Sequence, residues 1–577
     1  MRLILALVLG LVAGGASAAC DIKILADLPV TMAGAQPMIE ARINGAPASF
    51  VADSGAFYSI LSPAAAAENH LPLGPAPFGL RFDGVGGSAV LSVAKVKDFT
   101  LAGIPDPNVE FLVGGSETSV GQGVIGRNIL NQTDVEFDLA GGAIRLIRAD
   151  HCGGLGLAYW AKPPLTYSAV DMVVADGPSI LPAIIGAASV NGRRITVIFD
   201  TGASRSVLSL AAAKRLGIGP AAPGVVPAGM LGGFGPRLVR TWIAPVDVFE
   251  IGGEKIEHTH LVIGDIGEAG ADMYLGADFF LSHRIYVANS QRRIYFSYNG
   301  GAVFNLTPGS APPPPAIAES APTDAAAFAR RGAAEAARRD FPAAFGDFGK
   351  AMELDAKNAD YPYERGVTHL QAGQPVLAMA DFDRTLALAP TDTRALIARA
   401  GLHYAAHDHT GALDDLDAAS KALAPEANER LVLANLYRLS EAPARAVAQY
   451  DLWIKVRPDD RGLAEALGGR CWARMLLNVD LDKAMADCQG ALRRLPTDWG
   501  ALDGRAFINL RQGASDKAIA DFDQALKLQT KNAWPYYGRG LAELKQGRAD
   551  AAKADIAAAT AINPNIAKAA GRYGLAP

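Results

Sequence analysis

The pattern of apolar and polar residues changes near residue 305. Before this point, short runs rich in Val and Ile, such as ITVIF (195–199) and RIYVA (284–288), are bounded by Gly and Asn, as β-strands and turns are. After it, almost the whole sequence is typical of helices. The segment 305–323 between them has four consecutive prolines and almost no bulky apolar residues, which favours an extended, semi-rigid linker. The chain is therefore predicted to consist of a β part and a helical part.

The helical part repeats itself about every 34 residues. Large apolar residues recur at intervals of 34, 34, 34, 38, 34 and 34, at Phe348, Phe382, Leu416, Tyr450, Cys488, Phe522 and Ile556. A second, mostly small series lies sixteen residues earlier, at Gly332, Gly366, Ala400, Ala434, Trp472, Ala506 and Gly540. Prolines, which stop helices, follow the second helix of five repeats, at Pro390, Pro425, Pro458, Pro496 and Pro564. The 38-residue interval predicts an insertion before or within the repeat around Cys471.

These features resemble the tetratricopeptide repeat (TPR), with about seven copies over 324–577. The resemblance implies a superhelix of antiparallel helix pairs whose concave surface binds a peptide or a protein partner. A spacer or a dimerisation arm is the alternative, because a fold alone does not fix a function.

The β part also repeats itself, with a period near 147 residues. The segment ASFVADSGAFYSILS (48–62) matches ITVIFDTGASRSVLS (195–209), so that Asp53 corresponds to Asp200. Each Asp ends an apolar strand. GVIGRNIL (123–130) and YLGADFFL (274–281) follow at similar distances, and Gly-rich segments lie between them, DGVGGS (83–88) and MLGGFG (230–235).

Two carboxyl groups brought within hydrogen-bonding reach share one proton, because both cannot ionise cheaply. The ionised member then takes a proton from water and the protonated member polarises a peptide carbonyl. This chemistry requires no metal and no cofactor. The pair Asp53 and Asp200 is the candidate for it.

The paired motifs look like the retropepsin-like aspartyl protease family, with two copies in one chain over residues 25–300. The resemblance implies an all-β bilobal acid protease fold, with lobes at 20–155 and 156–304, and an aspartic endopeptidase that cleaves polypeptides with Asp53 and Asp200. It also implies supporting residues around the active-site loops: Ser54 and Thr201, whose hydroxyls bond across to the opposite lobe, Gly55 and Gly202 in the tight turns, and Gly126 and Gly276 packed beneath. Two flaps would cover the substrate, formed by Gly84, Val85, Gly86 and Gly87 and by Leu231, Gly232, Gly233, Phe234 and Gly235.

One position departs from that family. Phe57 in the first copy stands where the second has Ser204, and a small hydroxyl residue is usual there. A catalytically silent scaffold that binds peptides is therefore the alternative to a protease. Two further alternatives are a precursor that cuts itself near 305–323 and pairing of like copies between chains.

The N-terminus predicts export. Arg2 precedes an apolar run and the small residues Ala16-Ser17-Ala18, the layout of a signal peptide over 1–19. We expect a periplasmic or extracellular protein of a bacterial envelope. A lipid anchor on Cys20 is the rival interpretation. Export favours two disulfides among Cys20, Cys152, Cys471 and Cys488, with a Cys20–Cys152 bond excluding the anchor and four buried thiols as the alternative.

The composition limits the classes of partner that the protein is expected to bind. The 577 residues carry 54 Lys and Arg against 59 Asp and Glu, a formal charge of −5 without a dense basic run, so nucleic acid is not expected as a partner. Half the residues are apolar, which excludes wholesale disorder, and no segment after the N-terminal run would span a membrane. Two groups of neighbouring histidines, His258 and His260 and then His403, His407 and His409, do not form a metal-binding motif.

Overall fold

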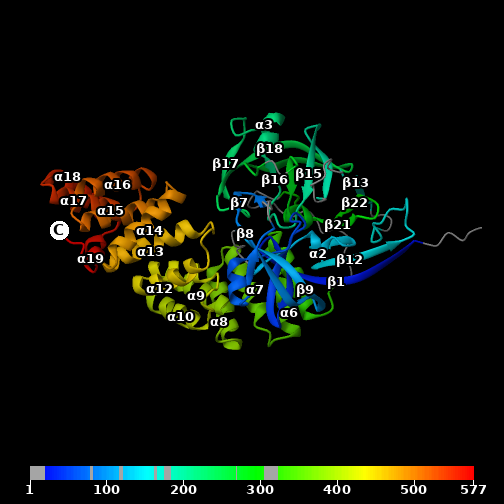
Figure 1. Cartoon of the computed structure of the whole chain (residues 1–577), viewed down its shortest axis with the longest axis horizontal. Helices are drawn as coiled ribbons and strands as arrows, with labels where there is room; N and C mark the ends of the chain where they lie inside the picture. Colours follow the sequence, from blue (N-terminus) through cyan, green and yellow to red (C-terminus); the bar gives the residue numbers. More distant parts are fainter. Residues whose placement is uncertain are drawn as a thin grey trace, which may run out of the picture.

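The computed structural model describes residues 20–77, 82–115, 121–161, 166–173, 183–267, 270–304 and 322–577. The predicted signal peptide, 1–19, and residues 305–321 of the predicted linker lie outside this range. The predicted change from strands to helices is confirmed, since the strands end with β22 at Tyr298 and the long helices begin with α5 at Ala325. Figure 1 shows the strands on the right and the later helices, α13 to α19, on the left, with α6 and α7 drawn below the strands.

The β part contains two similar sets of elements. The first set is β1 (Asp21–Ala33), β2 (Gln36–Ile43), β3 (Ala46–Ala52), β4 (Ile60–Leu61), α1 (Pro63–Glu68), β5 (Leu73–Pro75), β6 (Phe82–Gly84), β7 (Gly87–Ala89), β8 (Leu91–Leu101), β9 (Ile104–Gly114), β10 (Gly123–Ile125), α2 (Arg127–Leu130), β11 (Asp134–Asp138) and β12 (Ala143–Asp150). The second set is β13 (Ser168–Asp171), β14 (Ile185–Val190), β15 (Arg193–Phe199), β16 (Val207–Ser209), α3 (Leu210–Leu216), β17 (Val226–Leu231), β18 (Val239–Ile251), β19 (Glu254–Gly264), β20 (Met273–Leu275), α4 (Ala277–Phe280), β21 (His283–Ala288) and β22 (Arg293–Tyr298).

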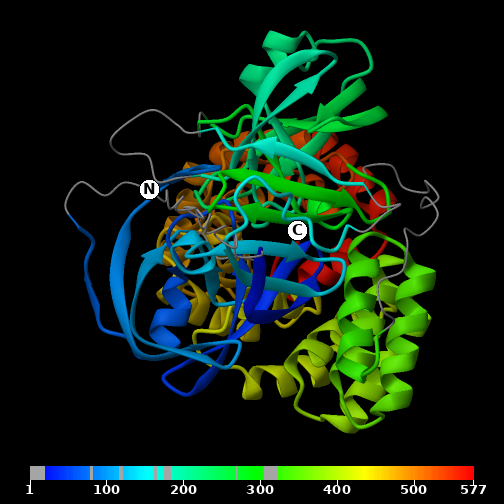
Figure 2. The same ribbon diagram turned by 90° about the vertical axis from the view of Figure 1, so that its right-hand side faces the viewer.

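A sheet shared by both lobes joins them. Six neighbouring strands of this sheet lie in the order β13-β22-β21-β11-β12-β1, and the middle pair of these six, β11 and β21, runs antiparallel, with Val135 opposite Val287. Each lobe contributes three equivalent strands, which relates the lobes by an approximate twofold axis. The second lobe, teal to green, lies above the blue first lobe in Figure 2. The two motif copies therefore meet inside one chain.

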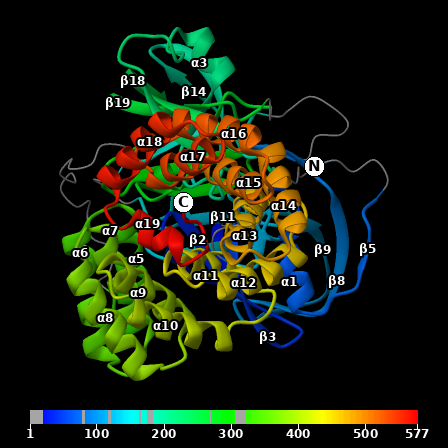
Figure 3. The same cartoon turned by 90° about the vertical axis from the view of Figure 1, so that its left-hand side faces the viewer.

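Within residues 322–577, seven helix pairs and a final short helix form the solenoid. The pairs are α5 (Ala325–Ala337) with α6 (Phe341–Leu354), α7 (Asp360–Gln371) with α8 (Pro375–Leu388), α9 (Thr393–Ala405) with α10 (His409–Ala422), α11 (Arg430–Leu439) with α12 (Pro443–Lys455), α13 (Leu463–Leu477) with α14 (Leu481–Arg494), α15 (Trp499–Arg511) with α16 (Ser515–Leu528) and α17 (Ala533–Lys545) with α18 (Ala549–Ile562), followed by α19 (Ile566–Gly571). Figure 3 shows these pairs as a curved row, green at the start and red at the end.

An ion pair that the sequence reading missed recurs along the solenoid. In six of the seven pairs, an Arg on the first helix binds both oxygens of an Asp on the second, at Arg331–Asp347, Arg365–Asp381, Arg399–Asp415, Arg470–Asp487, Arg505–Asp521 and Arg539–Asp555. Each Arg directly precedes the small residue of the repeat. Cys471 follows Arg470, so Cys471 occupies the small position that the sequence interpretation gave to Trp472.

The 38-residue interval has a structural origin. The connection from α12 to α13, residues 456–462, is seven residues long, whereas four residues, 529–532, join α16 to α17. Helix α13 also has 15 residues where α17 has 13. The longer loop is packed: the buried Arg457 lies over the Trp453 ring at 5.0 Å and donates to the Glu426 carbonyl at 2.7 Å. Its conformation is therefore fixed by the solenoid.

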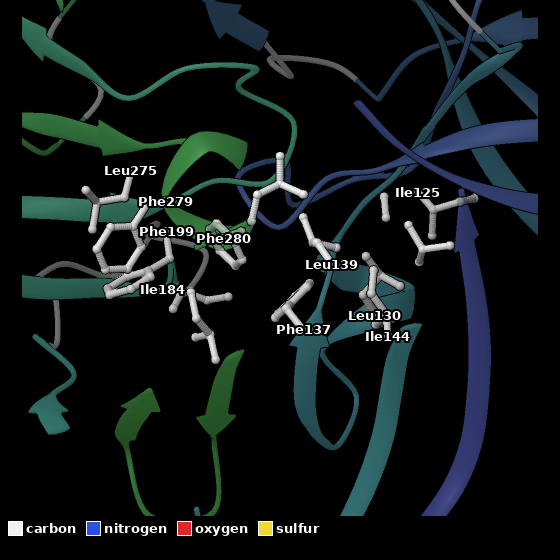
Figure 4. Close-up of a cluster of buried hydrophobic side chains, with 14 of the residues drawn as sticks. Ile125, Leu130, Phe137, Leu139, Ile144, Ile184, Phe199, Leu275, Phe279 and Phe280 are labelled. Atoms are coloured by element: carbon white, nitrogen blue, oxygen red, sulfur yellow. The ribbon is translucent and has the colours of Figure 1, made fainter. Parts of the chain in front are cut away.

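One apolar core joins both lobes to the start of the solenoid. Phe137 of the first lobe meets Phe280 of the second edge to face, with ring centroids 5.4 Å apart. Figure 4 shows side chains of the first lobe facing those of the second across this core. Ala333 and Phe348 of the first helix pair belong to the same cluster. The first TPR pair is thus anchored on the β part.

Disulfides join Cys20 to Cys152 and Cys471 to Cys488. The first closes the ends of the first lobe, across 132 residues, and the second links the two helices of the fifth pair. Because one sulfur cannot carry both bonds, the first pairing is incompatible with a lipid thioether on Cys20. Among the described residues, no helix is long and apolar enough to cross a membrane.

Candidate active site

Each candidate aspartate directly follows the last residue of a buried strand, at the point where the strand reaches the cleft. Strand β3 ends at Ala52 and runs parallel to β10, and β15 ends at Phe199 and runs parallel to β20. The ladder continues for one residue beyond each strand. Asp53 donates its N–H to the Ile125 carbonyl at 2.9 Å, and Asp200 donates its own to the Leu275 carbonyl at 2.8 Å. The backbone of both aspartates is therefore held by the sheet.

Tight turns bring the two carboxyl groups together. Asp53 Oδ1 accepts from the N–H groups of Gly55 and Ala56 at 2.9 and 2.8 Å. Asp200 Oδ1 accepts from Gly202 and Ala203 at 2.9 and 3.2 Å. The two side chains lie within hydrogen-bonding reach of each other, although they are 147 residues apart in the sequence.

Crossed hydrogen bonds lock the two turns. The Ser54 hydroxyl donates to the Phe199 carbonyl and accepts from the Thr201 N–H, both at 2.9 Å. In return, the Thr201 hydroxyl donates to the Ala52 carbonyl at 2.6 Å and accepts from the Ser54 N–H at 2.9 Å. Both side chains are fully buried. Each hydroxyl bonds to the opposite lobe, so a shift of one lobe against the other breaks all four bonds.

Glycine is required at four positions for lack of space. A Cβ on Gly55 would lie 2.3 Å from the Asp200 carboxyl carbon, and a Cβ on Gly202 would lie 2.3 Å from that of Asp53. At Gly126 and Gly276, a Cβ would meet carbonyl oxygens of the active-site loops at 2.6 Å. These glycines let the two loops and the segments beneath them approach closely.

The two carboxyl groups differ in acidity. Burial raises the pKa of Asp53, and hydrogen bonds from Ala56 and Gly55 and the charge of Arg127 oppose this rise. Burial also raises the pKa of Asp200, and the neighbouring charge of Asp53 raises it further, to well above the ordinary value. The arrangement therefore favours an ionised Asp53 and a protonated Asp200.

Arg127 is a site residue that the sequence reading missed. It begins α2 directly after Gly126, is 6% exposed, and lies over the Phe57 ring at 5.7 Å. Within the described ranges, its Nε and Nη1 have no hydrogen-bond partner. The charged residue next to a predicted supporting glycine was the available signal. Phe57, the departure noted above, is the surface on which this arginine stacks.

The two Gly-rich segments meet over the site. The first is the turn of the β6–β7 hairpin, and the second follows β17. Gly235 donates its N–H to the Val85 carbonyl at 2.9 Å, and the Arg237 N–H donates to the Gly86 carbonyl at 3.2 Å. A Cβ on Gly233 would lie 2.6 Å from the Val85 Cβ, so the tips interlock without room for a side chain.

A cavity of about 300 Å³ lies between these segments and the aspartates. Its lining includes both carboxylates and six of the predicted flap residues, Gly84, Val85, Leu231, Gly232, Gly233 and Phe234. The other predicted flap residues, Gly86, Gly87 and Gly235, are not part of the lining. Arg461 of the solenoid loop 456–462 also lines the cavity and donates from Nη1 to the Gly233 carbonyl at 3.0 Å. This contact between domains was not predicted.

Protein-family models match segments in both parts of the chain. Residues 39–129 and 186–279 match the aspartyl protease model. Residues 508–547 match a TPR repeat model, and residues 535–566 match a tetratricopeptide repeat model. The chain thus joins two segments that match the aspartyl protease model to segments that match TPR repeat models, in agreement with the two resemblances. Comparison with curated proteins finds no match.

Solved structures of low sequence identity also match part of the chain. A tetratricopeptide repeat protein from Parabacteroides merdae is 18% identical with a TM-score of 0.32, and the match covers 43% of this chain and 96% of that one. The APC/C hetero-tetramer Cut9-Hcn1 is 15% identical with a TM-score of 0.32, with coverage of 43% and 48%. YrrB, a TPR protein with an unusual peptide-binding site, is 15% identical with a TM-score of 0.22, with coverage of 38% and 93%.

Proposed function

We propose that this aspartyl protease domain, fused to a TPR solenoid, is an active endopeptidase that hydrolyses polypeptides with Asp53 and Asp200. The observation that carries the proposal is the dyad itself: two carboxyl groups in contact, each held by backbone N–H groups, at the base of a cavity covered by two interlocked segments. A buried pair of this kind is costly to maintain, since it raises the pKa of both groups.

The unequal acidities assign the roles. Asp53, nearer to Arg127, is the base and takes a proton from a water molecule, whose oxygen forms a bond to the scissile carbonyl carbon. Asp200 donates its proton to the carbonyl oxygen, which gives a tetrahedral diol. When the diol collapses, the C–N bond breaks, Asp53 passes its proton to the leaving nitrogen, and Asp200 regains a proton from a hydroxyl of the diol.

The solenoid supports a role in binding the polypeptide or a protein partner. TPR arrays present an extended concave surface, and here the array also contributes Arg461 to the catalytic cavity. We place the mature protein outside the cytoplasm, in the periplasm of a bacterial envelope or beyond it. The two disulfides support this placement, because such bonds persist in oxidising compartments.

The test is turnover of a library of unstructured peptides by the mature chain from about pH 4 to 7. Asp53→Asn and Asp200→Asn should each abolish cleavage while the protein stays folded by circular dichroism. Asp247→Asn, which changes an exposed aspartate of the second lobe, is the matched control and should keep full activity. Wild-type protein that binds peptides but cuts none of them would instead support the silent scaffold. Self-cleavage near 305–323 would show as two fragments in the wild type alone.

A further inference from the structure

The catalytic cavity shares two of its lining residues with a second cavity. Ser204 and Arg205, which follow Asp200 by four and five residues, line the first cavity and also line a second one of about 360 Å³. The remaining walls come from two distant parts of the chain. Gly34, Asp278 and Ser282 belong to the β part. Arg338 and Arg339 lie in the turn between α5 and α6, and Gln371 ends α7. The second cavity therefore lies between the protease domain and the first TPR pair.

The opposite end of the cleft is built differently. The counterparts of Ser204 and Arg205 in the first copy are Phe57 and Tyr58, and neither of them lines the catalytic cavity. Their rings pack against each other edge to face at 4.8 Å. Phe57 also covers Arg127, and Tyr58 packs against an apolar cluster that contains Ile60. The copies have diverged so that one end of the cleft is filled by aromatic rings and the other opens toward the solenoid.

Positive charge dominates the second cavity. Arg205 and Arg339 are exposed, and Arg338 is paired with Glu335 at 3.4 Å. The acidic residue in the wall is Asp278, which accepts from the Ser206 N–H at 2.8 Å and from its hydroxyl at 2.6 Å. Burial raises the pKa of Asp278, and the hydrogen bonds from Ser206 and the charge of Arg205 oppose this rise. The lining therefore offers an anionic ligand two exposed arginines, Arg205 from the β part and Arg339 from the solenoid.

We propose that this second cavity is a subsite for an acidic segment of the polypeptide substrate, several residues away from the bond that is cut. The segment would pass over Ser204 and Arg205 and bind between Arg205 of the protease and Arg339 of the solenoid. Guanidinium groups bind carboxylates through two parallel hydrogen bonds, which suits Glu and Asp side chains. The inference rests on the proposed function, because it extends the same cleft.

The test uses one cleavable core peptide with tails of Glu, Ser or Lys at either end. For the wild type, we expect a Glu tail at one end to raise kcat/KM about tenfold over the Ser tail, by lowering KM. A Lys tail at the same end should give a lower kcat/KM than the Ser tail. Arg339→Ala should remove most of this preference and leave hydrolysis of the short core unchanged, because Arg339 lines only the second cavity. Arg205→Ala should also remove most of the preference. Arg194→Ala, which changes an exposed arginine of the second lobe outside the cavity, is the control and should keep the preference.

Binding separates this inference from the proposed function. In the Asp200→Asn background, fluorescence anisotropy of the same labelled peptides should show tighter binding of the Glu tail, and the gain should disappear with Arg205→Ala. A protein that cuts no peptide but retains this Arg205-dependent binding would contradict the protease and keep the acidic subsite. Equal affinity for the Glu and Ser tails, or a preference that survives both arginine substitutions, would overturn the subsite whether or not the enzyme is active.

Discussion

The crossed hydrogen bonds between the lobes predict a large effect from one small substitution. Thr201→Val removes a hydroxyl at nearly constant volume, and it leaves the Ser54 N–H and the Ala52 carbonyl without their partner in a fully buried site. An unsatisfied buried group costs about 1–3 kcal/mol, so the two groups together cost roughly 2–6 kcal/mol. For a unit of this size, each kcal/mol lowers Tm by about 2–4 °C. We therefore expect the Tm of the β domain to fall by at least about 4 °C.

The effect should be local to the lobe interface. Amide hydrogen exchange measured on peptides that span 50–56 and 197–203 should accelerate strongly in Thr201→Val, because these segments carry the broken bonds. Peptides from the solenoid, such as 533–545, should exchange as in the wild type. Catalytic turnover should fall as well, since the two turns also position the carboxylates.

Thr201→Ser keeps the hydroxyl and is the matched control. It should restore most of the Tm and the slow exchange, with only the methyl group lost. The reasoning fails if the free energy of unfolding of Thr201→Val lies within about 0.5 kcal/mol of the wild-type value and both segments exchange at the wild-type rate. In that case the crossed bonds do not hold the lobes together.

Four further predictions follow from the same structure. The pKa of Asp200 in the folded protein lies well above its ordinary value of 3.8, so the folded state loses stability as the pH rises from 3.8 to the raised pKa. Asp200→Asn should therefore raise the Tm at pH 7 and lose this advantage below about pH 3.8. Arg127→Gln removes a charge that lowers the pKa of Asp53, and the acidic limb of the kcat/KM profile should move to higher pH. Arg461→Ala should raise KM several-fold by freeing the segment at Gly233, whereas the exposed Lys455→Ala should not; equal KM values would contradict this. Reduction of the Cys20–Cys152 bond, which spans 132 residues, should cost about 2–5 kcal/mol in urea unfolding, and an unchanged midpoint would count against it.

The sequence predicted those features that depend on local pattern or on the internal duplication. Apolar strands followed by Asp-Ser-Gly and Asp-Thr-Gly placed both aspartates at strand ends, and the duplication predicted that they would meet. The 34-residue period predicted the helix pairs in the same way. These signals are short in range or repeat within the chain, so no three-dimensional information was needed to find them.

Residues whose role depends on distant contacts could not be found in this way. Arg461 lies 228 residues from Gly233, and nothing near it in the sequence points to a protease cleft. Arg127 shows its role only once Phe57 is placed beside it. The small position in the fifth repeat was misassigned to Trp472 because a fixed spacing of sixteen was applied, whereas Arg470 and Asp487 are 17 residues apart. Helix α13 is longer than its counterparts, and the spacing shifts with it.

The solenoid touches the β part at both ends of an arc. Its first helix pair shares the apolar core of the lobes, and the loop 456–462 rests on the segment at Gly233. Between these two points the chain runs through α7 to α12, in which each helix pair packs mainly against its neighbours. Glu441, between α11 and α12, also pairs with Arg572 near the end of the solenoid. Because the arc contacts the β part at both ends, bending of the arc moves one contact relative to the other. Bending of the arc therefore displaces the loop 456–462 relative to the segment at Gly233, which covers Asp53 and Asp200.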